Sequence, residues 1–107
     1  MKNIQELVNE GVAAAKEAEK KFREQHGEPF YCGFAWVEIT VDRTNSKVAK
    51  ELIAAGFKTT YKPRVLSMWN PGGSCTQSMD IKEAGAHAMA SVLRDTGLSA
   101  YACSRAD

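Results

Sequence analysis

The sequence has few cysteines, and they are poorly placed for pairing. Cys32, Cys75 and Cys103 are odd in number and far apart, and no C-x-x-C pair occurs, so neither a disulfide framework nor a metal site is expected. The sequence also lacks an apolar run near the roughly 20 residues that cross a bilayer and the apolar core of a signal peptide. We therefore expect a cytoplasmic protein with reduced thiols, no metal, no cofactor and no membrane contact.

An excess of charge of one sign is also missing from the chain as a whole. The 14 basic and 13 acidic residues leave a net charge of +1, which predicts no overall attraction to polyanions. The distribution is less even, because the segment from Arg43 to Arg64 carries six basic residues against only Glu51. This basic segment is the first candidate for a binding surface.

The length and composition are those of one ordinary globular domain. The chain has 107 residues, of which 44% are hydrophobic and 25% charged, and this is enough for a single core. No repeat or linker divides it. We expect a single domain over 1–107, with an N-terminal helix over 1–27 and an α+β core over 30–107.

The N-terminal segment predicts a long amphipathic helix. Asn3 is the expected N-cap and Gly27 the expected stop, while apolar residues recur at steps of three and four. The predicted stripe is Ile4, Val8, Gly11, Ala15, Ala18 and Phe22. It must be covered, either by the rest of the chain or by a second copy in a short coiled coil, so a homodimer through this helix is one expectation.

The rest of the chain predicts alternating strands and helices. The expected elements are a strand over 31–41, a helix over 47–55, strands over 57–61 and 65–69, a helix over 79–96 and a strand over 98–103. The first strand is apolar on both faces, which indicates a central strand covered on both sides. The order β-α-β-β-α-β is that of a ferredoxin-like fold. Alternatively, Pro63 marks a bend in one long strand instead of a turn between two.

The loop before the last helix, "NPGGSCTQSMDIKEA", has the composition of a chemical site. Ser78 is the expected N-cap of the helix, but Asp80 and Glu83 in its first turns would repel a phosphate. Cys75 has no basic side chain placed to activate it, so we assign no catalytic residue and lean against an enzyme. The expected buried stripe of the helix is Ile81, Ala84, Gly85, Ala88, Met89 and Val92.

Three aromatic residues, Phe34, Trp36 and Trp69, lie on the two strands expected to be central. On an open sheet face beside a basic turn, they would resemble the layout of an RNA-recognition motif, although the segment from Arg64 to Pro71 does not match its octamer. The alternative that we favour is that the first helix covers this face and that the aromatic residues belong to the core.

The segments "CGFAWVEI" and "QSMDIKEAGAHAMASVLRDTGLSAYACSRAD" resemble small uncharacterised proteins of tailed bacteriophages. The resemblance runs over about residues 32–107 and carries no functional residue with it. It implies a setting, the infected bacterial cell, in which such proteins often bind a host component and redirect or inhibit it.

These patterns favour a small interaction protein that binds a host or viral macromolecule, with a protein as the first expectation, for example as an inhibitor of host machinery or antiviral defence. A nucleic-acid-binding module that uses residues 43–64 is the first alternative. A small-molecule or nucleotide-binding protein, or an enzyme, that uses residues 72–78 and Arg105 is the second. The candidate binding residues are Lys47, Lys50, Lys58, Lys62, Arg64, Trp36, Trp69 and Arg105.

Overall fold

A computed structural model describes residues 3–27, 33–43, 45–73 and 78–106. The elements in chain order are α1 (Ile4–His26), β1 (Gly33–Thr40), α2 (Lys47–Ala54), β2 (Lys58–Thr59), β3 (Val65–Trp69), α3 (Met79–Asp95) and β4 (Ser99–Ala106). The predicted α+β class is confirmed, because the described residues form three helices and one four-stranded antiparallel sheet.

The strands lie in the order β2-β3-β1-β4, so β1 and β3 are central as expected. The alternative of one bent strand at Pro63 is wrong, because β2 and β3 are separate strands that pair antiparallel. The hydroxyl of Thr60 tightens the turn between them. It accepts a hydrogen bond from the backbone N–H of Lys62 at 3.1 Å and lies 3.0 Å from the carbonyl oxygen of Val65.

Strand β1 is covered on one face only. Its residues 33, 35, 37 and 39 are buried, whereas those between them are half-buried or exposed. The prediction of a strand covered on both sides is therefore wrong. On the other face of β1, Phe34 and Trp36 pack against Trp69 of the neighbouring strand, and no helix or strand of the described residues lies over them.

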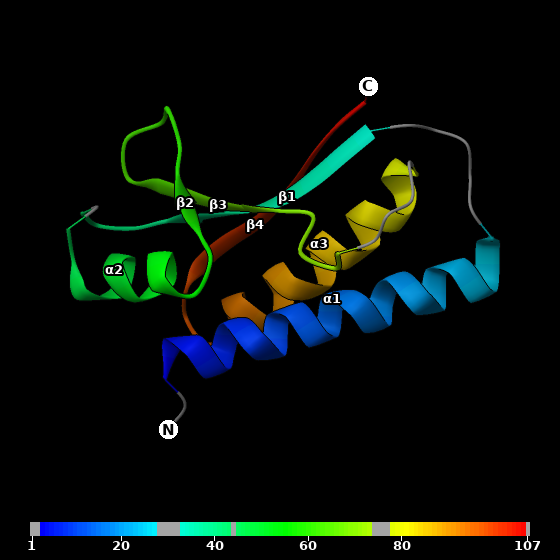
Figure 1. Cartoon of the computed structure of the whole chain (residues 1–107), viewed down its shortest axis with the longest axis horizontal. Helices are drawn as coiled ribbons and strands as arrows, with labels where there is room; N and C mark the ends of the chain where they lie inside the picture. The colour runs from blue at the N-terminus through cyan, green and yellow to red at the C-terminus, as the bar shows by residue number, and fades with distance from the viewer. Residues whose placement is uncertain (1–2, 28–32, 44, 74–77, 107) are drawn as a thin grey trace.

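All three helices lie on the same side of the sheet (Figure 1). Helix α1 runs along α3, and Gly11 permits the close approach, since a Cβ there would lie 2.8 Å from Cγ of Met89. The favoured expectation that α1 covers the aromatic face is thus wrong. The stripe proposed for a coiled-coil homodimer is covered by α3 of the same chain.

The buried side of α1 differs from its predicted stripe at the C-terminal end. The buried residues are Val8, Gly11, Ala15 and Glu19. Phe22, expected to be buried, is half-buried and packs against the ring of His26 at 4.7 Å between centroids. Near the C-terminal end of α1 the buried residue is therefore Glu19, whereas the apolar pattern predicted Ala18 and Phe22.

The helix ends agree with the sequence. The side chains of Asn3, Ser46 and Ser78 accept hydrogen bonds from the first turns of α1, α2 and α3. The buried face of α3 is rotated around the helix from the predicted stripe, because both the sheet and α1 pack against it. It consists of Ile81, Gly85, Ala86, Met89, Ala90 and Leu93, so Ala84, Ala88 and Val92 were assigned wrongly.

Candidate functional site: the open face of the sheet

The side of the sheet opposite the helices is here called the open face. Cross-strand pairing sets which side chains share it, since directly opposed residues point to the same side. Trp36 on β1 lies opposite Trp69 on β3 and Cys103 on β4, and Phe34 lies opposite Arg105. The open face carries Phe34, Trp36, Glu38, Ser67, Trp69, Tyr101, Cys103 and Arg105.

An aromatic cluster occupies the middle of the open face. The rings of Trp36 and Trp69 stack with centroids 4.6 Å apart and planes inclined by 16°, and Phe34 meets Trp69 edge-on at 5.9 Å. Such contacts contribute roughly 0.5–1.5 kcal/mol each beyond area burial. Trp69 is nevertheless 54% exposed, and Tyr101, elsewhere on the open face, is 56% exposed.

A hollow of about 450 Å³ opens beside the tryptophan stack. Its lining residues are Trp36, Glu38, Thr59, Thr60, Tyr61, Lys62, Ser67, Trp69 and Arg105. The residues come from all four strands and from the turn between β2 and β3. Aromatic rings and cationic side chains dominate the lining, with one carboxylate among them.

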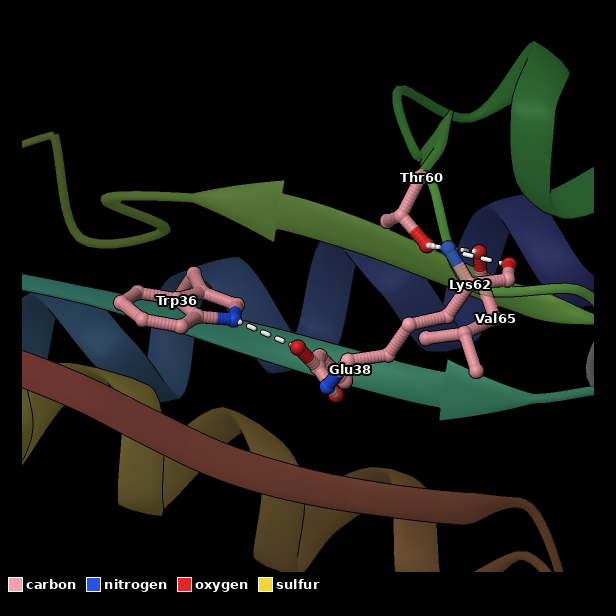
Figure 2. A network of polar contacts seen from close by, with 5 residues as sticks. All are labelled: Trp36, Glu38, Thr60, Lys62 and Val65. Atoms are coloured by element: carbon pink, nitrogen blue, oxygen red, sulfur yellow. Dashed lines mark hydrogen bonds and ion pairs between the residues drawn. The ribbon is translucent and has the colours of Figure 1, made fainter.

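That carboxylate, Glu38, contacts both Trp36 and Lys62 (Figure 2). Its Oε2 accepts a hydrogen bond from the indole N–H of Trp36 at 2.9 Å, and its Oε1 lies 3.5 Å from Nζ of Lys62. The first contact fixes the plane of the Trp36 ring. The second places the ammonium group of Lys62 beside the carboxylate, where it offsets part of its negative charge.

Cys103 sits on the open face directly opposite Trp36. Burial, followed by the nearby Glu38 carboxylate, raises the pKa of its thiol above the ordinary value. A raised pKa keeps sulfur protonated and therefore unreactive as a nucleophile.

The structure divides the predicted basic residues among different surfaces. Lys62 and Arg105 line the hollow, and Lys58 lies beside Trp69 at the outer edge of the sheet. Lys47 and Lys50 are exposed on α2, on the helical side. The basic segment is thus not one patch, and Arg64, exposed in the turn with a positive φ of 62°, does not line the hollow.

Arg105 lies on the open face because β4 is longer than predicted. The expected strand ended at Cys103, whereas the observed strand continues to Ala106 and pairs Arg105 with Phe34. At the same end of β1, Lys82 of α3 donates to the carbonyl oxygen of Gly33 at 3.1 Å and places Nζ 5.4 Å from the Phe34 ring centroid. Cations therefore flank the aromatic cluster from both the sheet and α3.

On the helical side, sequence reasoning missed a buried carboxylate. Glu19 is only 4% exposed, and its Oε2 has no hydrogen-bond partner in the part of the chain that the structure describes. A Cβ on Gly72 or Gly85 would collide with its carboxylate, so two glycines make its space. Burial raises the pKa of Glu19 to about 7, although the charges of Arg23 and Lys82 oppose the rise.

The second alternative, a site formed by residues 72–78 with Arg105, falls largely on residues 74–77, which lie outside the described residues. Gly72 lies against α1 on the helical side, whereas Arg105 lies on the open face. Cys75 and Cys32 fall outside the described residues. Among the residues that are described, no group of three His, Cys, Asp or Glu side chains could hold a metal ion, and no helix has the length and apolarity to cross a membrane.

Comparisons with known proteins add no relative to this picture. No protein-family model matches the chain, and no curated protein or solved structure shows significant similarity to it.

Proposed function

We propose that this chain is a non-enzymatic binding protein that holds a macromolecular partner against the open face of its sheet. The observation that carries the proposal is the placement of its exposed aromatic side chains. Tyr61, Trp69 and Tyr101 stay largely in water on or beside one face, while the other side of the same sheet is covered by three helices. Tryptophan, tyrosine and arginine are the residues that dominate binding energies at protein surfaces.

The chemistry of the hollow supports binding over catalysis. Glu38 is engaged by Trp36 and Lys62, and the thiol of Cys103 is held protonated. A general base or nucleophile needs a free, activated group within reach of its substrate. The described side chains of the face instead offer ring surface and fixed positive charge, which suit recognition.

For the setting of this function we propose the cytoplasm of a bacterial cell infected by a tailed phage, where the protein would bind a host or viral component. What supports this is the pattern resemblance of residues 32–107, together with the small size of the chain. By binding such a component, the protein would inhibit host machinery or antiviral defence.

We also propose that the part of the chain after α1 is a ferredoxin-like core. The strand order β2-β3-β1-β4 supports the assignment, as do three antiparallel pairings and the helices that follow β1 and β3. In such a core the helices pack on one side of the sheet, and the other side is available for binding.

A comparative capture experiment tests the proposed function. The full chain is immobilised and exposed to bacterial lysate in three forms: unaltered, Trp69→Ala with Arg105→Ala, and Lys47→Ala with Lys50→Ala. The last pair removes exposed charges from α2 without touching the open face. We expect partners that the unaltered chain and the α2 variant retain and that the open-face variant loses. Retention of every partner by the open-face variant would refute the proposed function.

A further inference from the structure

We propose that the open face binds single-stranded nucleic acid, with bases against the tryptophan stack and phosphates on the flanking cations. This inference rests on the proposed function and names the partner. The geometry that points to it is the juxtaposition of Trp69, Lys62 and Arg105 around one hollow.

The ring surface needed for a base is present. Trp36 and Trp69 already stack on each other, yet Trp69 remains 54% exposed, so part of its ring is open toward the hollow. Bases of a single strand present free π-faces and stack on aromatic side chains without strong sequence preference. In a duplex those faces are covered by neighbouring base pairs, so a flat aromatic surface favours single strands.

The charges suit an anionic backbone. Lys58, Lys62 and Arg105 surround the aromatic cluster, whereas Glu38 is the one carboxylate among the lining residues and is paired with Lys62. Lys82 adds a fourth cation at the Phe34 end of the cluster. The cations therefore lie around the aromatic cluster and not at one end of it.

A fluorescence titration of the full chain tests this inference. The chain contains two tryptophans, and both are in the proposed site, so stacking of a base should quench the intrinsic emission. The probes are a 12-nucleotide oligo(dT), an oligo(U) of the same length, the corresponding mononucleotide, and a duplex of mixed sequence. We expect quenching by the single strands, weaker binding of the duplex, and no saturable binding of the mononucleotide.

Substitutions on the open face and on α2 show which residues bind the oligonucleotide. Trp69→Ala should weaken oligonucleotide binding at least about fivefold, the lower end for loss of one stacked base, and Trp36 still reports it. Arg105→Ala should lower the log–log salt slope by about 0.7, the contribution of one phosphate on a single strand. Lys47→Ala with Lys50→Ala is the matched control and should change neither quantity.

One further variant distinguishes the loss of a binding contact from the loss of the fold, because it is expected to increase the affinity. Glu38→Gln keeps an oxygen that can accept from the indole of Trp36 but removes the negative charge and frees Lys62. Its affinity for oligo(dT) should rise, a gain that a damaged fold cannot produce. Equal or weaker binding by a folded Glu38→Gln chain would contradict the inference.

The outcomes separate the inference from the proposed function. Absence of quenching by every oligonucleotide at low salt overturns the inference, as does binding that only the α2 variant weakens. If the lysate experiment then yields a nuclease-resistant protein partner that depends on Trp69, the open face binds protein and only the inference falls. Tight binding of the mononucleotide alone would make the hollow a small-molecule site and overturn both.

Discussion

The buried carboxylate of Glu19 should make the stability of the protein fall as pH rises from about 4.5 to about 7. Burial raises its pKa from the ordinary 4.5 to about 7, so between these values the folded chain keeps a proton that the unfolded chain has released. The unfolded state is then favoured by each increase in pH, at about 1.4 kcal/mol per pH unit. Over the whole interval the contribution amounts to about 3 kcal/mol, and above pH 7 it no longer changes.

Glu19→Gln tests this reasoning, because it keeps the shape of the side chain and removes the ionisation. We expect its free energy of unfolding, measured in urea, to exceed that of the unaltered chain at pH 8 by up to about 3 kcal/mol. The difference should shrink steadily as pH is lowered to 4.5. The control is Glu24→Gln on the exposed side of the same helix, which should follow the unaltered chain throughout. A Glu19→Gln difference independent of pH, or a less stable variant at pH 8, would refute the account of this site.

Further expectations follow from the packing. Gly72→Ala should cost about 1–3 kcal/mol of stability through overpacking, because its Cβ would collide with the Glu19 carboxylate; a double-mutant cycle with Glu19→Ala should recover much of this loss. Ser78→Ala should cost about 1 kcal/mol, because it removes the N-cap of α3; thermal denaturation measures it, and an unchanged melting temperature would contradict the assignment. Amide hydrogen exchange should be slowest in residues 36–40 of β1, which pair with β3 on one side and β4 on the other; faster exchange there than in β4 would contradict the sheet order.

Local signals in the sequence predicted the helices and the position of β3 well. Asn3 and Ser78, the two N-caps expected from the sequence, cap α1 and α3 in the structure. Such signals work because N-capping depends on residues only three apart in the chain. The separation of β2 from β3 was likewise predicted by Pro63, which has no N–H for a ladder.

The side on which elements pack could not be read from the same patterns. An apolar strand face looks alike in sequence whether a helix covers it or a cross-strand tryptophan does, so the coverage of Trp36 was predicted wrongly. Glu19 was overlooked because the space for its carboxylate comes from Gly72 and Gly85, which are far from it in sequence. Arg105 entered the open face because the pairing of β4 with β1 runs on to the end of both strands.

Site-specific photo-crosslinking in bacterial lysate tests whether the partner is bound on the open face. A photoreactive amino acid replaces Tyr101, which is 56% exposed on the open face, or in a separate chain Ile53, which is 41% exposed on α2. The account predicts a defined crosslinked product from position 101, none from position 53, and loss of the product when Trp69→Ala is added. Products from position 53 alone, or of equal yield from both positions and insensitive to Trp69→Ala, would contradict it.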